Sequence, residues 1–317
     1  MYNAAIIGAG QLGSRHLQGL KTSSLPFKIW VLDNSEESLS LAKQRYDSVQ
    51  QIGDKEIYLV TKIERLPENL DFVVVATGSL PRASLLKALL SHSRVRYMVL
   101  EKVLFPRLAE YEEIAQLIKE KGVKCWVNCV RRLFGVFHQV ELSLTGNPIK
   151  MQYEGAEWGL CCNSIHLIDL FMMFTREDKY TLDTSNLLPE VVDSKRKGYI
   201  EFFGTIKAKT PKGSCLTLIC NKDKSDNDSV ISIKDGNNVI LIDEGKSTLT
   251  INGIQSSFRL PYQSETTGIY ADMLLKTEYL PLTTFDISAR YHKEFISKML
   301  DFYNSLRDEK TDLLPIT

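Results

Sequence analysis

A glycine-rich motif lies close to the start of the chain, between an apolar run and a helical pattern. It reads Gly8-Ala9-Gly10-Gln11-Leu12-Gly13. In a strand–turn–helix context the first glycine permits a tight turn, the second lets the backbone approach a pyrophosphate, and the third lets helix and strand pack closely. The start of the helix adds free N–H groups and a partial positive charge. The alternative is a purely structural glycine turn. The motif predicts a dinucleotide-binding loop with contacts from Gly8, Gly10, Gln11, Leu12 and Gly13.

An acidic residue, Asp33, ends the next apolar run, 20 residues after Gly13. An acid at this spacing accepts hydrogen bonds from the adenosine ribose hydroxyls in dinucleotide-binding folds. Its charge repels a 2′-phosphate, and the following Asn34 and Ser35 bring no cation to compensate. We therefore predict that Asp33 and Asn34 contact NAD, and that NADP is disfavoured. The alternative role for Asp33 is a helix N-cap, a role that Ser35 can also fill.

Polar residues follow two later apolar runs: Thr77, Gly78 and Ser79 come after one, and Glu101 and Lys102 after the next. Because the carboxyl ends of parallel strands form the ligand crevice of such a sheet, all five are predicted to contact the cofactor. A lysine in this place can also donate a hydrogen bond to a carbinol oxygen or act as a base. The alternatives are a turn with a helix cap for the first group and a solvated lysine for Lys102.

A helical pattern in the second half of the chain carries Asn163, His166 and Asp169. These residues are three apart, so they lie along one face of the helix. A histidine changes its charge near neutral pH, which suits proton transfer, although a lone histidine in an apolar helix can equally be a core residue. Two adjacent arginines, Arg131 and Arg132, offer bidentate contacts to an anionic substrate or, alternatively, form salt bridges at the interface between the two domains.

Short apolar runs alternate with helical patterns through the first 130 residues. The runs are apolar at successive positions, as strands covered on both faces should be. They are 4–7, 28–32, 57–60, 72–76, 96–100 and 123–127, and the helical patterns are 12–20, 36–46, 82–90 and 108–121. This alternation predicts right-handed βαβ units and a doubly wound parallel α/β sheet of the Rossmann type. His16, on the first helix, is expected to pack there or to lie at the helix surface.

The pattern changes after about residue 130. It predicts strands at 133–144 and 149–157, an apolar helix at 163–174, several short strands between 198 and 260, and a helix at 287–306. We predict an NAD-binding Rossmann domain over 1–128 and a substrate-binding and oligomerisation domain over 129–317. The second domain is expected to be α+β, with a mostly antiparallel open sheet. The last helix could pack back on the first domain.

The composition limits the kinds of partner. The 39 Lys and Arg residues balance the 39 Asp and Glu residues, which argues against nucleic acid and against a polybasic membrane surface. No uncharged apolar stretch is long enough for a transmembrane helix, and the N-terminus lacks the pattern of a signal peptide, so we expect a cytoplasmic protein with reduced thiols. The six cysteines match no zinc pattern. The charged run at 222–228, expected to be a solvated turn, lacks the glycine and glutamate of a calcium loop, so no metal site is predicted.

Taken together, the motifs are similar to those of the Gfo/Idh/MocA family, which includes glucose–fructose oxidoreductase and inositol dehydrogenase. The shared features are the glycine motif, Ala-Thr and Glu-Lys after two strands, and a later helix with His-x-x-Asp. The resemblance implies that Lys102 and His166 are catalytic and that His166 binds or deprotonates a substrate hydroxyl. It also implies substrate positioning by Asn163, Arg131 and Arg132, with Asp169 orienting His166 or bracing the helix. Val103 replaces the proline of the usual Glu-Lys-Pro triplet, and Cys162 stands where many members carry an aspartate.

The resemblance implies an NAD-dependent oxidoreductase that transfers a hydride between nicotinamide and a hydroxyl or carbonyl carbon. The implied substrate is a sugar, a cyclitol or a nucleotide-linked sugar. The two arginines favour a charged sugar, as used in surface-polysaccharide synthesis. Members are often dimers or tetramers, so a homo-oligomer is expected by analogy. The cysteine at position 162 keeps two alternatives open: a non-redox enzyme that retains NAD, and a non-catalytic dinucleotide-binding sensor.

Overall fold

The computed structural model describes residues 1–222 and 230–317, and the chain divides into two compact units. The first unit comprises Met1–Phe105, Ala109–Asn128 and Pro261–Phe285, and the second comprises Pro106–Leu108, Cys129–Leu260 and Asp286–Thr317. The segment from Pro261 to Phe285 thus belongs to the first unit, whereas the sequence placed it in the second domain. A charged turn was expected at 222–228, and its residues 223–228 lie outside the described part of the chain.

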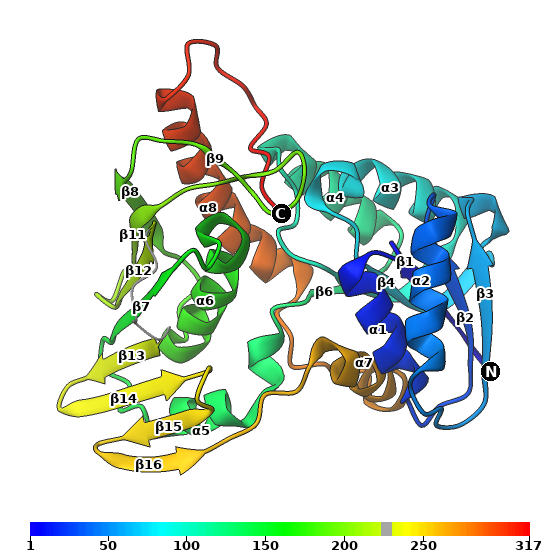
Figure 1. Ribbon diagram of the computed structural model, residues 1–317, viewed down its shortest axis with the longest axis horizontal. Helices are drawn as coiled ribbons and strands as arrows, with labels where there is room; N and C mark the ends of the chain where they lie inside the picture. Colours follow the sequence, from blue (N-terminus) through cyan, green and yellow to red (C-terminus); the bar gives the residue numbers. More distant parts are fainter. Residues whose placement is uncertain (223–229) are drawn as a thin grey trace. The chain divides into compact units, whose positions relative to one another are not determined.

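The first unit is built on a six-stranded parallel sheet with the order β3-β2-β1-β4-β5-β6 (Figure 1). Its strands are β1 Tyr2–Ile7, β2 Phe27–Leu32, β3 Lys55–Val60, β4 Asn69–Val75, β5 Arg94–Leu100 and β6 Lys124–Val127. The central strands are buried on both faces, while the edge strand β3 is largely exposed. The predicted Rossmann sheet is confirmed. The strand order reverses between β1 and β4, and this switch is where such sheets bind ligands at their carboxyl ends.

Four helices follow these strands in the order that βαβ units require. They are α1 Gln11–Lys21, α2 Glu36–Asp47, α3 Ser79–His92 and α4 Leu108–Glu120, and a short 3₁₀ turn, η1 Ile63–Arg65, precedes β4. Each helix begins close to the carboxyl end of its strand. Consequently, the loops after β1, β2, β4 and β5, which carry the predicted cofactor residues, lie along one edge of this unit.

A further helix, α7 Gln263–Thr277, packs against α1, and the sequence analysis did not identify it. The two helices approach closely because each has a glycine at the crossing. A Cβ on Gly19 would lie 3.0 Å from the backbone nitrogen of Thr267, and one on Gly268 would lie 2.6 Å from the carbonyl oxygen of Gly19. Side chains at these positions would force the helices apart. The contact brings α7 beside α1, the helix that follows the glycine motif.

The second unit holds an eight-stranded sheet with the order β16-β15-β14-β13-β7-β12-β11-β8. The strands are β7 Lys150–Ala156, β8 Thr181–Leu187, β11 Gly204–Lys209, β12 Cys215–Asn221, β13 Val230–Asp235, β14 Asn238–Asp243, β15 Thr248–Ile251 and β16 Ile254–Ser257. Only β7 and β12 pair in parallel, so the mostly antiparallel sheet is confirmed. A separate pair, β9 Val192–Asp193 and β10 Ile200–Glu201, forms a small ribbon.

The helices of the second unit are η2 Val130–Leu133, α5 Gly135–Ser143, α6 Leu160–Thr175 and α8 Phe285–Ser305. The strand predicted at 133–144 is wrong, because this segment forms α5. Its buried residues Val136, Phe137 and Val140 recur at helical spacing. The apolar residues of this segment also fit the pattern of a strand, which led to the wrong prediction. The last helix, α8, is bonded to β8: the Tyr180 hydroxyl, just before that strand, donates to the Tyr291 carbonyl at 2.6 Å.

Within residues 1–222 and 230–317, no helix is both long and apolar enough to cross a membrane. All six cysteines are free thiols. In the same described part of the chain, no group of three or more His, Cys, Asp or Glu side chains is arranged to hold a metal ion.

Candidate functional site

The glycine loop after β1 has the geometry that its sequence predicts. Gly8 has a φ of +93°, which only glycine adopts readily, and a Cβ there would lie 3.0 Å from Cγ2 of Thr77. A Cβ on Gly13 would lie 1.7 Å from the carbonyl oxygen of Gly8, so α1 packs directly on the loop that precedes it. Both positions therefore require glycine for the backbone to follow this path.

The middle of the same loop is open. Gly10 is exposed and has no atom within 4 Å of an added Cβ, and Gln11 beside it is exposed as well. Gly10 is the N-cap of α1 and supplies no side chain to the first turn, which begins with Gln11 and Leu12. The first N–H groups of this helix therefore face a space that a phosphate can enter. The loop fits the pyrophosphate of a dinucleotide.

Asp33, at the end of β2, is tied to this loop. One carboxylate oxygen accepts from the Ala9 N–H at 2.7 Å, and the other accepts from the Ser35 N–H at 2.9 Å. Ser35 caps α2 by accepting from the Ser38 N–H at 3.1 Å, so the cap does not need Asp33. Asn34 is exposed. Asp33 is thus fixed beside the glycine loop, where a ribose would follow the pyrophosphate.

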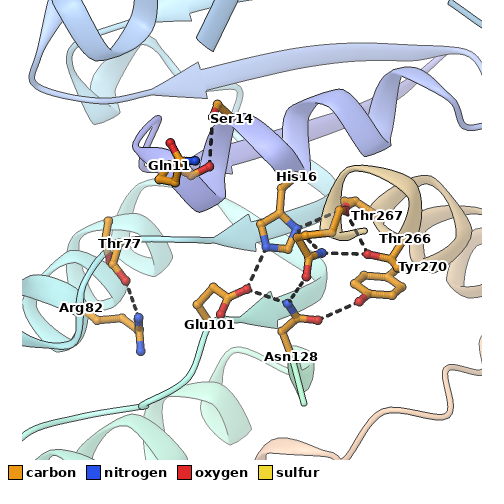
Figure 2. Close-up of polar contacts among 11 residues, drawn as sticks. Gln11, Ser14, His16, Thr77, Arg82, Glu101, Asn128, Thr266, Thr267 and Tyr270 are labelled. Atoms are coloured by element: carbon orange, nitrogen blue, oxygen red, sulfur yellow. Dashed lines mark hydrogen bonds and ion pairs between the residues drawn. The ribbon is translucent and has the colours of Figure 1, made fainter. Parts of the chain in front are cut away.

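The loop after β4 lies against the glycine loop. Its Thr77 contributes a buried hydroxyl oxygen that has no hydrogen-bond partner within the described residues, an arrangement that suits a donor or acceptor on a bound molecule. Gly78 is the N-cap of α3, and Ser79 is fully buried at its first position. Thr77 is the residue of this loop that fits a cofactor contact best, and Figure 2 shows it near the start of α1.

Glu101, at the end of β5, is buried in a network of side chains (Figure 2). Its carboxylate accepts from Nε2 of His16 at 2.9 Å and from Nδ2 of Asn128 at 2.6 Å. Burial alone would raise the pKa of Glu101, but the hydrogen bond and charge of His16, the charge of Lys102 and the bond from Asn128 lower it to about 2. This carboxylate is an anion held by protein donors, a role that the sequence did not predict for it.

Lys102 follows directly and is 7% exposed. The peptide bond between Lys102 and Val103 is cis. On the far side of this bond the chain is held by Arg82, a fully buried arginine of α3 that donates to the carbonyls of Thr77, Val103 and Leu104. The sequence pattern gave Arg82 no role. An arginine in the first turn of an otherwise apolar helix was the feature that could have drawn attention to it. It joins the loops after β4 and β5.

In the second unit, α6 carries the other predicted catalytic residue, the half-buried His166. The N-cap of this helix is Gly159, not Asn163, and the acceptor for its first turn is the Glu201 carboxylate of β10. Glu201 accepts from the N–H groups of Cys161 and Cys162 at 2.6 and 3.2 Å. The Asn163 side chain instead donates to the Trp158 carbonyl at 2.6 Å. The helix expected at 163–174 therefore begins three residues earlier, at Leu160, and a carboxylate from β10 caps it.

Both arginines of η2 are paired with carboxylates of the second unit. Arg131 donates to Glu244 through two nitrogens at 2.8 and 2.7 Å. Although burial alone would lower the pKa of Arg131, the charge and hydrogen bonds of Glu244 raise it. Arg132 donates from Nε to the buried Asp169 at 2.6 Å and from Nη2 to its carbonyl at 2.9 Å. Arg132 and Asp169 together fix the 3₁₀ turn to the middle of α6.

A pocket of about 360 Å³ opens at the N-terminal end of α6 and lies entirely within the second unit. Its lining combines an indole, an amide, two thiols, three acidic side chains and two cations; it includes Trp158, Asn163, Cys162, Glu201, Lys195 and Arg196. Such a mixture of ring, charge and hydrogen-bonding groups suits a hydroxylated, charged small molecule. Two residues singled out from the sequence, Cys162 and Asn163, thus share one pocket.

Each unit gathers its own share of the predicted residues. The first brings the glycine loop, Asp33, Thr77 and Lys102 to one edge of its sheet, and it adds His16, Arg82 and Asn128, which the sequence did not assign a role in the site. The second brings Asn163, His166 and Asp169 onto one helix, as their spacing predicts. Long-range partners, such as Thr267 for His16, were not visible in any local pattern.

Comparison with known proteins confirms the resemblance drawn from the motifs. Residues 2–129 match the Gfo/Idh/MocA family of oxidoreductases, described as having an NAD-binding Rossmann fold. Residues 2–129 are therefore similar to the NAD-binding part of oxidoreductases of that family. No curated protein matches the sequence.

Solved structures extend the similarity to the fold of both units. UDP-N-acetylglucosamine 3-dehydrogenase GnnA from Acidithiobacillus ferrooxidans has a TM-score of 0.74 at 13% identity, covering 96% of this chain and 99% of that one. An oxidoreductase from Agrobacterium radiobacter, in complex with NAD+, L-tartaric acid and magnesium, has a TM-score of 0.70 at 14% identity, covering 96% and 97%. The super-repressor mutant of Gal80p from Saccharomyces cerevisiae has a TM-score of 0.68 at 14% identity, covering 97% and 99%.

Proposed function

We propose that this protein is an NAD-dependent dehydrogenase or reductase that acts on a hydroxyl or carbonyl carbon of a sugar, a cyclitol or a nucleotide-linked sugar. The observation that carries the proposal is the position of Lys102. It is buried at the carboxyl end of β5, next to an ionised glutamate, in the unit that also carries the glycine loop and Asp33. A lysine so placed at the binding edge of a Rossmann sheet suits proton transfer to a substrate oxygen.

The cofactor is proposed to be NAD in preference to NADP. The Asp33 carboxylate is fixed by the N–H groups of Ala9 and Ser35, so it cannot easily move away from a 2′-phosphate. Both of its oxygens keep a further lone pair for the ribose hydroxyls. We assign cofactor contacts to Gly8, Gly10, Gln11, Leu12, Gly13, Asp33, Asn34, Thr77, Gly78, Ser79, Glu101 and Lys102.

NAD held by the glycine loop would supply the acceptor for the hydride of the carbinol carbon, so that the alcohol would become a carbonyl. The protein has to accept the hydroxyl proton that is released, and in the reverse direction has to return it. We assign this proton to Lys102 and His166, of which Lys102 is the buried amine and His166 the half-buried imidazole on α6. An amine and an imidazole can each move a proton between substrate oxygen and solvent.

The substrate class is proposed from the pocket at the N-terminal end of α6. The Trp158 ring can stack on a sugar face, Asn163 can contact its hydroxyls, and Lys195 with Arg196 can balance an acidic group. GnnA, which shares the fold, is named as a dehydrogenase of a nucleotide sugar. Since Arg131 and Arg132 are already paired with Glu244 and Asp169, their proposed contribution is to hold η2 and α6 in place beneath the substrate.

Homo-oligomerisation is proposed for the outer face of the large sheet. Val239 and Leu241 of β14 are 43% and 39% exposed on that face. Two exposed apolar side chains on the same face of one strand are suited to contact a second copy. Sedimentation of the purified protein checks this directly, and a monomer at micromolar concentration would contradict it.

Cys162 favours a second candidate, a non-catalytic dinucleotide sensor or a non-redox enzyme that retains NAD. A thiol cannot supply the charge of the aspartate that many family members carry there. The fold is also that of a protein described as a super-repressor mutant, Gal80p. In this case NADH would bind, but no hydride would reach a substrate.

The test is turnover of NAD or NADH with a panel of polyols, keto-sugars and nucleotide sugars, followed by the absorbance of reduced nicotinamide. Lys102→Ala should lower kcat by about 10² to 10⁴, the contribution of a positioned acid or base. Lys87→Ala is the matched control, because Lys87 is an exposed lysine of α3 in the same unit. Equal rates for the two variants would overturn the role of Lys102. NADH binding without any turnover would favour the sensor or the non-redox enzyme.

A further inference from the structure

We propose that His16 is a positioning residue that links the dinucleotide-binding helix α1 to Lys102 through the carboxylate of Glu101. The sequence suggested only a packing or surface role for His16. In the structure the side chain is fully buried, and both ring nitrogens have partners: Nε2 lies 2.9 Å from Glu101, and Nδ1 lies 2.8 Å from the Thr267 hydroxyl. This inference rests on the proposed function, because it concerns how Lys102 is held for catalysis.

The bonds around the ring define its proton positions. The Glu101 carboxylate is ionised and can only accept, so Nε2 of His16 must donate to it. On the other side, Nδ1 can accept from the Thr267 hydroxyl and, at 3.3 Å, from the amide of Gln263. Nε2 is a donor to Glu101 in the neutral ring with the proton on Nε2 and in the charged ring alike. The imidazole is a fixed connector with one donor aimed at Glu101.

The other donor to Glu101 is Asn128, which belongs to a chain of hydrogen bonds that ends on α7. Asn128 donates from Nδ2 to both Glu101 and Gln263, at 2.6 and 2.9 Å, and its carbonyl oxygen accepts from the Tyr270 hydroxyl at 2.8 Å. Figure 2 shows these side chains converging from α1, from the ends of β5 and β6, and from α7. Glu101 is held from two sides, and a buried anion held in this way has one orientation.

This orientation fixes Lys102 because Glu101 is its immediate neighbour in the chain. On the other side of Lys102, the buried guanidinium of Arg82 holds the carbonyls of Val103 and Leu104. The lysine is thus placed between two anchored segments, one held from α1 and one from α3. Since α1 is also the helix that receives the cofactor phosphate, His16 ties the lysine to the cofactor's own binding element.

Amine reactivity measures this arrangement without any substrate. Limited acetylation of the purified protein with acetic anhydride, followed by peptide mass spectrometry, reports how often the Lys102 amine is exposed. We expect His16→Ala to raise the acetylation rate of Lys102 by about tenfold, because loss of the Glu101 anchor lets the loop open locally. His16→Gln should restore the wild-type rate, because its amide N–H can reach Glu101.

Two controls separate positioning from general loosening. Lys21, on the same helix as His16, is also 7% exposed and should keep its acetylation rate in every variant. His138→Ala removes an exposed histidine of the second unit and should change neither lysine. An unchanged Lys102 rate in His16→Ala would overturn the proposal, as would an equal rise at Lys21 and Lys102, which indicates a purely structural role.

Turnover supplies the second readout. With a substrate from the panel, His16→Ala should lower kcat by about 100-fold, the cost of misplacing a catalytic group, while KM for NAD stays within about threefold. His16→Gln should recover most of kcat. If the wild type binds no NADH or transfers no hydride, the proposed function fails, whereas the acetylation result still decides the placement of Lys102 by His16. A large rise in KM with unchanged kcat would contradict positioning.

Discussion

In the first unit the candidate residues are held by buried hydrogen bonds, whereas in the second they are held by ion pairs and a helix cap. Glu101 and Glu201 show the difference. Glu101 accepts from the side chains of His16 and Asn128 in a closed network, and Glu201 accepts from two backbone N–H groups at the start of α6. The first arrangement fixes one loop in one geometry. The second leaves a pocket beside the helix, lined by Cys162 and Asn163.

The two arrangements differ in how well they tolerate substitution of their residues. A closed network around Glu101 permits little variation, because each donor has one acceptor and an orphaned partner is costly. The pocket at α6 is lined by groups that are partly exposed and can be exchanged more freely. We therefore expect the first unit to set the chemistry and the second to set the choice of substrate.

The largest effect is expected from the tightest backbone contact of the first unit. Gly13→Ala places a Cβ 1.7 Å from the Gly8 carbonyl oxygen, so the glycine loop has to move. We expect NADH binding, followed by nicotinamide fluorescence, to be abolished. Gly10→Ala meets no atom within 4 Å and should leave the melting temperature unchanged while weakening NADH binding. Normal NADH affinity in Gly13→Ala would refute the assignment of the loop.

The next effect tests the ion pairs of the second unit. Asp169→Asn leaves the Arg132 guanidinium without its buried partner, and removing one member of such a pair costs about 4 kcal/mol of unfolding free energy. Glu244→Gln, whose pair with Arg131 is about one fifth exposed, should cost about 1 kcal/mol. Urea unfolding of both variants provides the measurement. Equal losses would show that burial does not distinguish the two pairs.

Acid stability gives a test of the network around Glu101. Its pKa is lowered in the folded protein to about 2 from an ordinary value of 4.5, so the stabilisation is complete above pH 4.5 and is lost as pH falls towards 2. The shift corresponds to at most about 3 kcal/mol, at 1.36 kcal/mol per pKa unit. In urea unfolding between pH 5 and 3, Glu101→Gln should therefore show a shallower loss of stability than the wild type. Parallel slopes would mean that Glu101 is not held as an anion.

A moderate effect is expected on cofactor choice. Asp33→Ala removes the proposed acceptor for the ribose hydroxyls and the charge proposed to repel a 2′-phosphate. We expect NADH affinity to fall about tenfold, or 1.4 kcal/mol, and NADPH affinity to rise. Fluorescence titration with both cofactors measures the ratio. An unchanged preference would place the ribose elsewhere.

The elements and motifs of the first unit were predictable because their signals are local. The glycine motif, Asp33 and the apolar strands occupy short stretches of sequence, and the parallel sheet follows from their alternation. The segment at 133–144 was misread as a strand, because its apolar residues fit both periods. The helix α7 was missed, and its glycine contact with α1 joins segments that are far apart in the chain.

The residues that hold the candidate site in place could not be predicted, because their contacts join segments that are far apart in the sequence. His16 and Thr267 are 251 positions apart, and Asn128 and Tyr270 are 142 apart, so no spacing rule connects them. Likewise, the acceptor at the start of α6 is Glu201, which lies about 40 positions away from Cys161 in the chain. Candidate catalytic residues can be recognised by their residue type, but the residues that hold them in place can be identified only in the folded structure.

Transfer of a labelled hydride tests the central claim most directly. The protein is incubated with NADH that carries deuterium at the nicotinamide C4 position, together with the panel of keto-sugars and nucleotide keto-sugars, and the products are examined by mass spectrometry. If the protein is a dehydrogenase that uses Lys102, one class of product gains the deuterium, and Lys102→Ala forms this product much more slowly than Lys87→Ala. Tight NADH binding with no deuterium in any product would contradict the assignment as a dehydrogenase.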